Sequence, residues 1–450
     1  MSAAAEFARF GAEVIWSDVP ADIRHKLVAH LIDTIAVMCA GAATAEAAAL
    51  LSCHAPRPGG CRVVAHNIRL APMDAAVLNA FAGRRHTFDD TLEAGPIHPG
   101  SAVWAAALAA GEHARAPLVR VLAAALCGYE LAVRLADALG PGHYDAGFHG
   151  TGTCNAPAAG LAAALAVGLD ATRATHAVNL AAAAAAGTRQ YQIDGSVAHS
   201  ALNGARAAAA GVQSAIFAGA GTDAPAGQLD GKWGFLGLFD AVQPLATGDL
   251  GTVWAMRRVG LKPFPTCRFT HGPIAETDRL RRQHGLTQAD IAHVDIRTFA
   301  QSASVSDRPH WQGRQDAILS HQFALAATLA EGPPDLASLD RLATDDAVHD
   351  IAGRIGVTID PALDRREADA WPHHLRITLR DGRVLEGFSP SPPGADDDCP
   401  ASRGKAEQLI TPALGPACLP ALRALLAQPE GKAATALTDL LCPRAPPDGH

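Results

Sequence analysis

The stretch Ala156–Leu169, with the sequence APAAGLAAALAVGL, decides the fold class. It contains no charged side chain, and alanine occurs on all of its faces when it is wound as a helix. A helix that is apolar all round is buried among other helices. Alanine also has the highest helix propensity of the amino acids. The stretch therefore predicts a buried helix inside a closely packed, multi-helix bundle.

Similar patterns extend from about Ala21 to Leu261. Ile23, Leu27, Leu31 and Ile35 follow one another at a spacing of four, which predicts an amphipathic helix over 21–40 that ends near Gly41. We predict further helices over Met73–Ala82, Ala102–Glu112, Leu118–Leu139 and Ala205–Ala218. Glycine-rich breaks separate these helices, and loops on a rigid scaffold are where functional sites usually lie.

The pattern changes after Pro263–Pro265. Apolar and polar residues alternate over 294–298, which predicts a strand, and a second strand is expected over 357–359. The run 375–379, followed by Asp381-Gly382 and then 384–385, predicts a hairpin with a type I′ turn. The expected fold is mainly α. It comprises an all-helical domain (1–265), a smaller α+β lid domain (266–400) and C-terminal helices (401–450) that return to the helical domain.

Composition restricts the functional classes. Hydrophobic residues make up 49% of the chain and charged residues 18%, which excludes a disordered chain. The net charge is −8 and no basic stripe is present, so we expect neither nucleic acid nor a membrane as a partner. No signal peptide is recognisable at the N-terminus, and the nine cysteines are scattered without CxxC spacing. These features predict a cytoplasmic protein with reduced thiols.

One segment, residues 86–101 (HTFDDTLEAGPIHPGS), concentrates groups that can carry chemistry. Two adjacent aspartates, two threonines and two histidines lie between two apolar helices. Asp90 or Thr91 could simply cap a turn, and His98 could cap the following helix. Placing titratable side chains beside buried helices costs free energy, however, and such groups concentrate at functional sites. The cluster as a whole therefore indicates a functional site.

Three motifs in this order resemble the MmgE/PrpD family, which includes 2-methylcitrate dehydratase, cis-aconitate decarboxylase and iminodisuccinate epimerase. They are TFDDT at 87–91 with HPG at 98–100, GFHGTGT at 147–153, and KPFPTCRFTH at 262–271. The resemblance covers nearly the whole chain. It implies a two-domain helical enzyme without a cofactor or a metal, and a homodimer. His98, His149, Thr91 and Lys262 match positions that line the family's site.

The chain departs from the family pattern at four positions. Thr87 stands where the family has the first aspartate of its motif, and Ser200, beside His199, stands where it has a lysine. Cys267 and Val305 stand where cis-aconitate decarboxylase has a histidine and a tyrosine. These differences weaken the decarboxylase interpretation in particular.

The chemistry expected of such a site is removal of a proton next to a carboxylate, which needs an acid and a base that work near neutral pH. His98 and His149 are the predicted acid–base pair. Tyr144, Tyr191 and His199 are further catalytic candidates, although each tyrosine could equally be a half-buried packing residue. The predicted substrate-binding residues are Asp90, Thr91, Arg189, Ser200, Lys262, Cys267, Arg268 and His271.

The predicted function is therefore a cofactor-independent lyase of the dehydratase type that acts on a small di- or tricarboxylic acid. An epimerase or isomerase of a dicarboxylate is the first alternative. A decarboxylase of a cis-aconitate-like acid and a homologue that binds without catalysis are the others. Substrate identity and the histidine that acts as base are beyond the sequence.

Overall fold

The computed structural model describes residues 1–194, 196, 199–365, 370–394 and 404–443. The chain divides into two compact units. The helical unit comprises Met1–Arg189, Ser200–Leu261 and Ser402–His450, and the α/β unit comprises Gln190–His199 and Lys262–Ala401. The sequence-based boundaries placed 190–199 in the helical domain, whereas this segment groups with the α/β unit in the structure. Each unit is described by itself below.

The helical unit contains long helices, short 3₁₀ helices (η) and one two-stranded ribbon. Its elements are α1 (Ala3–Glu13), η1 (Trp16–Asp18), α2 (Ala21–Ala42), α3 (Ala45–Ser52), β1 (Cys61–Arg62), β2 (Arg69–Leu70), α4 (Pro72–Arg84), α5 (Pro99–His113), α6 (Leu118–Asp145), α7 (Gly150–Thr153), α8 (Asn155–Val167), α9 (Ala171–Ala183), α11 (His199–Gly219), α12 (Phe235–Leu238), η2 (Ala255–Arg258), α20 (Lys405–Leu414), α21 (Cys418–Ala427), α22 (Ala434–Thr438) and η6 (Asp439–Leu441). All six helices predicted in this part of the chain are confirmed. His199, the first residue of α11, groups with the α/β unit.

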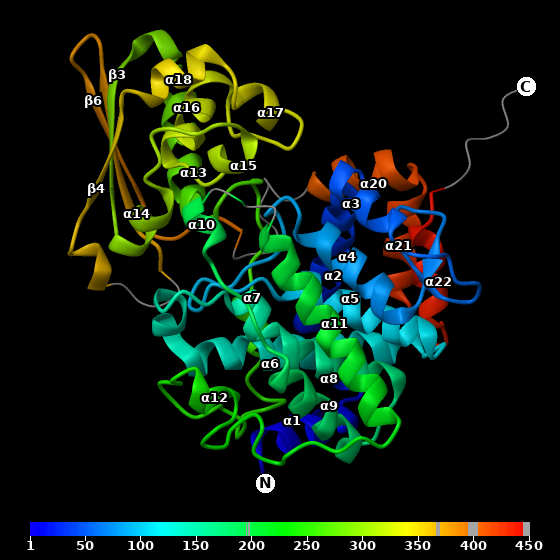
Figure 1. Ribbon diagram of the computed structural model, residues 1–450. Helices are drawn as coiled ribbons and strands as arrows, with labels where there is room; N and C mark the ends of the chain where they lie inside the picture. Colours follow the sequence, from blue (N-terminus) through cyan, green and yellow to red (C-terminus); the bar gives the residue numbers. More distant parts are fainter. Residues whose placement is uncertain (195, 197–198, 366–369, 395–403, 444–450) are drawn as a thin grey trace, which may run out of the picture. The chain divides into compact units, whose positions relative to one another are not determined.

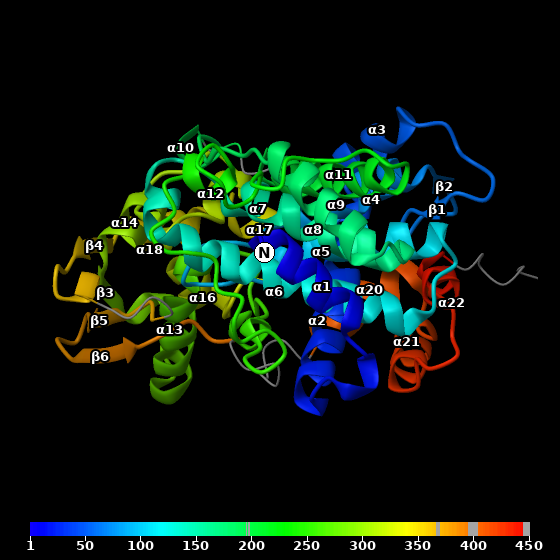
Figure 2. The ribbon, with the colours of Figure 1, turned by 90° about the horizontal axis from the view of Figure 1, so that it is seen from below.

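Two of the alanine-rich helices, α5 and α8, form the centre of the helical unit and pack side by side (Figures 1 and 2). Every residue of α5 except His113 is buried, and so is every residue of α8 except Val167. Backbones approach closely here because side chains are small. A Cβ atom added to Gly160 of α8 would lie 2.8 Å from the Cβ of Ala181 in α9. This density gives the unit a rigid interior.

The long helix α6 bends near its end. Gly140 has a φ of 64° and is followed by Pro141, which interrupts the helical hydrogen bonding. The bend lies just after Leu139, where the sequence predicted the end of this helix, although His143 and Tyr144 beyond the bend are still buried.

Among the described residues, α2 is the single straight helix long and apolar enough to cross a membrane. Within the unit, 72% of its most apolar window is buried, and it packs against α4 and α20. It also buries the polar side chains of Lys26, His30 and Asp33. These are the properties of a core helix whose polar groups have partners inside the protein.

The α/β unit is a four-stranded sheet covered by helices. Its elements are α10 (Tyr191–Asp194), η3 (Arg268–Thr270), α13 (His271–His284), η4 (Gln288–Asp290), β3 (Ile291–Thr298), α14 (Ala300–Ser306), α15 (Arg314–Ala317), α16 (His321–Glu331), α17 (Leu339–Leu342), α18 (Asp346–Ala352), β4 (Ile355–Ile359), η5 (Leu363–Arg365), β5 (His373–Leu379) and β6 (Val384–Ser389). The strand order is β4-β3-β5-β6, with β3 and β4 parallel and the other neighbours antiparallel.

One face of this sheet is apolar and carries α13 and α16, which Figure 1 shows on the same side. Ile296 of β3 pairs with Leu375 of β5, and both side chains are buried on that face. Arg297 and Arg376 point to the opposite face and are exposed. The alternation that predicted these strands therefore reflects one covered and one open face.

The predicted β5–β6 hairpin is confirmed, but the predicted type I′ turn is wrong. A type I′ turn needs positive φ at both central residues, whereas Gly382 alone has one, of 86°. The N–H of Gly382 donates to Leu379 O and the N–H of Leu379 donates to Arg383 O, which makes a three-residue loop with glycine in the left-handed position. The Asp381 carboxylate accepts from the N–H of Arg383 and stabilises this alternative.

A chain of buried polar side chains lies inside the α/β unit. The Ser302 hydroxyl is 2.9 Å from His321 Nε2 and 3.3 Å from His373 Nε2. Burial lowers the pKa of His321 to about 3, because the charged imidazolium would lose its hydration. The folded protein therefore keeps His321 neutral at pH values where the unfolded chain protonates it.

The free energy of unfolding should consequently fall as the pH drops below about 6.5, the ordinary histidine pKa. The folded pKa is the lower one, so the stabilising contribution is fully present above 6.5 and is lost toward pH 3. Between pH 7.5 and pH 5, this histidine alone should account for a loss of roughly 2 kcal/mol. Urea unfolding at both pH values, followed by tryptophan fluorescence, measures the loss.

The variant His321→Leu removes the titrating group and should reduce this pH dependence by most of that amount, even if it is less stable at pH 7.5. Substitution of the exposed His284 by leucine is the matched control and should leave the pH dependence unchanged. An unchanged pH dependence in His321→Leu would contradict the assignment.

Candidate active site

The two histidines of the predicted acid–base pair each stand directly before a buried helix. His98 is the N-cap residue of α5, and His149 is the N-cap residue of α7. After Cys154, whose backbone is itself helical, the chain continues as α8. The imidazole rings are stacked with their centroids 6.3 Å apart and their planes at 27°. Both residues are buried, with exposed fractions of 8% and 2%.

Hydrogen bonds to the backbone of His98 hold the two helix starts together. The N–H of His98 donates to Thr151 Oγ1 at 3.1 Å, and Asn155 Nδ2 donates to the carbonyl of His98 at 2.8 Å. Glycines are required at this junction. A Cβ at Gly150 would lie 2.4 Å from Ile97 Cγ2, and one at Gly152 would lie 2.3 Å from Ala186 O. The GTGT segment therefore allows the close approach that brings the histidines together.

The positive ends of the two helix dipoles accordingly meet beside the histidine rings. Helix N-termini favour anions because their first N–H groups lack partners within the helix. A carboxylate is the anion expected of the predicted substrates. At α5 the protein itself meets this preference, since Pro99 has no N–H and the N–H of Gly100 donates to the Asp90 carboxylate, so the preference for a substrate anion applies to the start of α7, which continues into α8.

The partners of the two Nδ1 atoms differ. His98 Nδ1 lies 2.7 Å from the carbonyl oxygen of Asp90, which can only accept, so Nδ1 carries a proton. In the neutral ring, His98 Nε2 then has the lone pair. His149 Nδ1 lies 3.2 Å from Asn203 Nδ2, an amide donor that also points to Thr188 O. His149 Nδ1 therefore accepts, and in the neutral ring its proton is on Nε2. In the neutral rings, His98 Nε2 can therefore accept a proton as a base, and His149 Nε2 can donate a hydrogen bond.

The carboxylates of the segment face the protein interior. Asp90 Oδ2 accepts from the Tyr129 hydroxyl at 2.6 Å and lies 2.9 Å from His30 Nδ1, and Asp90 Oδ1 accepts from the N–H of Gly100 at 2.9 Å. Asp89 Oδ1 accepts from Arg84 Nη1 at 2.6 Å. The predicted substrate contact of Asp90 stays a prediction, and its carboxylate is already held by three donors.

The backbone of this segment is tied to distant parts of the helical unit. Thr91 and Gly260 exchange two backbone hydrogen bonds, of 2.9 Å and 2.8 Å. Lys405 Nζ of α20 donates to the carbonyl of Phe88 at 2.6 Å and pairs with Asp33 at 2.7 Å. Thr87 has a φ of 55°, a left-handed conformation that β-branched residues rarely adopt. Contacts on both sides hold the strained turn in place.

Three further predicted site residues belong to the helical unit: Tyr144, Arg189 and Ser200. Arg189 lies over the Tyr144 ring, 3.8 Å from its centroid, and donates to the Tyr144 carbonyl at 2.9 Å. Ser200 is 1% exposed, and its hydroxyl has no hydrogen-bond partner among the described residues. Ser200 lies one helical turn before Asn203 on α11, on the same face as the residue that holds His149.

The remaining predicted residues belong to the α/β unit. The rings of Tyr191 and His199 are 6.1 Å apart. Lys262 is buried, with an exposed fraction of 1%, and Cys267 is the buried N-cap residue of η3. Arg268 Nη1 donates to Pro393 O at 2.6 Å and lies 3.2 Å from Nδ1 of His271, the first residue of α13. Arg268 and His271 thus belong to one local cluster.

Sequence reasoning did not identify several residues that hold the histidine pair: Arg84, Tyr129, His30 and Asn203. It included Asp89 among the two adjacent aspartates of residues 86–101 but gave it no role of its own. His30 carried a usable signal, since it interrupts the apolar side of the helix predicted over 21–40. Asn203 and Tyr129 carried none, because each lies among other polar residues of an alanine-rich stretch, such as Ser200 and Glu130, and nothing in the sequence distinguishes it from them.

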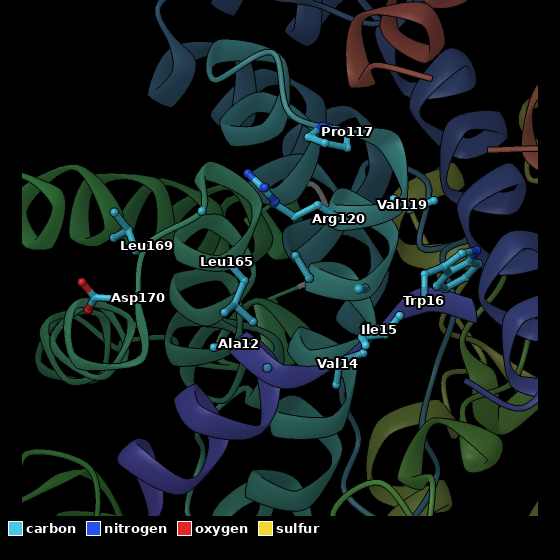
Figure 3. A pocket seen from close by; sticks show the side chains of 14 residues that line it. Ala12, Val14, Ile15, Trp16, Pro117, Val119, Arg120, Leu165, Leu169 and Asp170 are labelled. Atoms are coloured by element: carbon cyan, nitrogen blue, oxygen red, sulfur yellow. The ribbon is translucent and has the colours of Figure 1, made fainter. Parts of the chain in front are cut away.

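Other potential sites are less informative. Among the described residues, no group of three or more histidine, cysteine, aspartate or glutamate side chains is placed to hold a metal ion. A cavity of about 490 Å³ lies between α1 and α6 at the far end of α8, with Arg120 and Asp170 at its margin (Figure 3). Its walls are mainly apolar, and α8 separates it from His149 by a length of roughly 20 Å.

Comparison with known proteins relates both parts of the chain to one family. Residues 5–246 match the MmgE/PrpD N-terminal domain, and residues 264–414 match the MmgE/PrpD C-terminal domain. The first match includes both histidines of the pair, and the second begins just after Lys262.

Similar curated proteins agree with this relation. Two cis-aconitate decarboxylases of Aspergillus terreus are 24% and 23% identical to the chain. The first alignment covers 89% of this chain and 87% of the relative, and the second covers 88% and 86%. The cis-aconitate decarboxylase-like protein oryM of Aspergillus oryzae is 29% identical over 39% of each chain. The two domain matches together span most of the sequence, so the chain belongs to the MmgE/PrpD family.

Proposed function

We propose that this protein is a cofactor-independent lyase of the dehydratase type that acts on a small di- or tricarboxylic acid. The observation that carries the proposal is that the Nδ1 atoms of two neighbouring imidazoles have opposite partners, a carbonyl acceptor at His98 and an amide donor at His149. His98 Nε2 has the lone pair of a base, and His149 Nε2 has the proton of a hydrogen-bond donor. His149 stands before α7 and α8, and the N-terminus of a helix favours the anionic groups of such an acid.

The pair can carry out a β-elimination. His98 Nε2 takes the proton from the carbon next to a substrate carboxylate, and the electron pair of that C–H bond forms the new C=C bond. The C–O bond at the β carbon breaks, and the departing hydroxide takes the proton back from His98 to leave as water. His149 Nε2–H donates to the carboxylate oxygen on which charge accumulates. His98 ends the cycle as it began.

The surroundings of His98 suit a base that becomes positively charged. Asp89 Oδ1 lies 3.9 Å from His98 Nδ1, so a carboxylate faces the ring from the side opposite Nε2. Such a carboxylate favours the imidazolium that forms when Nε2 takes a proton. The pairing of Asp89 with Arg84 keeps this carboxylate in place.

Decarboxylation is the second candidate, because the similar curated proteins are cis-aconitate decarboxylases. In that reaction, the C–C bond to a carboxylate breaks, CO₂ leaves and the carbon takes a proton. The reaction would therefore begin with a protonated histidine. Cys267 and Val305, at positions where that enzyme is expected to have a histidine and a tyrosine, favour the dehydratase instead.

Incubation of the protein in D₂O with 2-methylcitrate, citrate, cis-aconitate and a chiral dicarboxylate distinguishes these reactions. We expect loss of water from a β-hydroxy acid, observed by NMR as a new olefinic product. Evolution of CO₂ from cis-aconitate would support the decarboxylase instead. Deuterium incorporation with loss of stereochemistry would support an epimerase. A protein inactive on all four substrates would contradict the lyase proposal as stated.

The pH dependence of kcat/KM gives a second distinction. A dehydratase that starts with neutral His98 should lose activity on the acid side of its profile, where His98 becomes protonated. A decarboxylase that starts with protonated His98 should lose activity on the alkaline side. Initial rates measured between pH 5 and 9 on the substrate found above decide between them.

The variants His98→Ala and His149→Ala should each lower kcat by at least about 100-fold, the typical range for removal of a general acid or base being 10² to 10⁴. His25→Ala, at an exposed histidine of the same unit, is the matched control and should retain full activity. Circular dichroism and thermal unfolding check that the variants fold. Normal turnover in a folded His98 or His149 variant would remove that residue from the mechanism.

A further inference from the structure

A cluster behind His98 holds the carboxylate of Asp90 from three elements of the helical unit. Tyr129 comes from α6, His30 from α2, and the N–H of Gly100 from the first turn of α5. The side chains of Tyr129 and His30 are completely buried, and Asp90 is 1% exposed. A Cβ at Gly100 would lie 2.8 Å from each carboxylate oxygen, so the glycine leaves the space that the carboxylate fills.

The same residue, Asp90, determines which nitrogen of His98 carries the proton. Its carbonyl oxygen accepts from His98 Nδ1 at 2.7 Å, while its carboxylate is fixed at the other end. A neutral imidazole carries its proton on either nitrogen, and the partner of one nitrogen selects the tautomer. The direction of the Asp90 carbonyl therefore decides whether Nε2 has a lone pair.

Two contacts fix the direction of this carbonyl, one through the backbone and one through the cluster. Asp90 lies outside any helix or named strand, and the N–H of its own peptide group, that of Thr91, donates to Gly260 O at 2.9 Å. Its carboxylate, by contrast, meets two side chains whose rings are in edge-to-face contact, with centroids 5.8 Å apart. The Tyr129 ring is also in contact with Trp104 of α5, which limits its movement.

We infer that Tyr129 and His30 are positioning residues that fix the Nδ1–H tautomer of His98 by holding Asp90. Neither residue touches the substrate. Their effect on the reaction is to keep His98 Nε2 unprotonated and in a constant direction. The inference rests on the proposed function for the role of His98 as a base, whereas the tautomer itself can be measured without a substrate.

The experiment uses the full-length protein labelled with ¹⁵N in its histidine rings. Long-range ¹H–¹⁵N correlation spectra at pH 8 distinguish the two nitrogens of each neutral ring, and the signals of His98 are those lost in His98→Gln. In the unsubstituted protein we expect the Nδ1–H tautomer. Tyr129→Phe removes one hydroxyl and should change the tautomer ratio toward Nε2–H, by up to about fivefold if the whole free energy of one hydrogen bond is coupled to the tautomer.

The substitutions at His30 test the second contact. His30→Leu removes the donor to Asp90 and should change the ratio in the same direction. His30→Asn places an amide N–H close to the original Nδ1 and should restore the ratio of the unsubstituted protein. Thr328→Val, which removes a buried hydroxyl from α16 in the other unit, is the matched control and should have no effect on His98.

The outcomes separate this inference from the proposed function. If His98 keeps the Nδ1–H tautomer in folded Tyr129→Phe and His30→Leu, the positioning role is wrong, whatever the activity. If the tautomer changes but the protein acts on none of the substrates tested above, the positioning role stands and the proposed function fails. With an active substrate, both variants should also displace the acid limb of the pH profile, which a purely structural loss of stability would not do.

Discussion

The attachment of two helix starts to one residue, His98, is the interaction on which the site depends. The N–H of His98 is held by Thr151 of α7 and its carbonyl by Asn155 of α8, the two consecutive helices that follow His149. The N–H of a helix N-cap residue has no partner within its own helix, and its C=O can accept a second hydrogen bond, so both groups favour such contacts. Because the second helix satisfies them, the two histidines are fixed at one distance, and the glycines and alanines around them leave no room for another arrangement.

Much of the helical unit could be predicted from the sequence because its helices are long and consist mostly of alanine and other apolar residues. Ala156–Leu169 and Ala102–Glu112 could hardly be anything but buried helices. The turn between β5 and β6 was predicted less well, since Asp-Gly fits two kinds of hairpin loop. The choice between them depends on one additional backbone bond from Leu379 to Arg383. Local sequence does not determine such a bond.

Some residues of the site could likewise be found from the sequence, and others could not. His98 and His149 could be found from the sequence because each begins a glycine-rich break before an alanine-rich helix. Tyr129 and Asn203 could not, because their partners are 39 and 54 positions away along the chain. His30, whose partner is 60 positions away, is marked in the sequence only as a polar residue on the apolar side of its helix. Asp90 was predicted to bind substrate from its place beside Thr91. The structure directs its carboxylate toward the core, where burial demands hydrogen-bond donors.

The contact of Lys405 with Asp33 and with the carbonyl of Phe88 has a consequence for the order of events during synthesis. Asp33 is fully buried, and burial raises the pKa of its carboxyl group, so its charged form depends on the nearby lysine. On a ribosome adding 5–20 residues per second, Lys405 is made roughly 20 to 70 s after Asp33. The helical unit is thus completed by the last part of the chain, after the whole α/β unit has been synthesised. A nascent chain that stops before α20 lacks the lysine that secures the segment carrying Asp89 and Asp90.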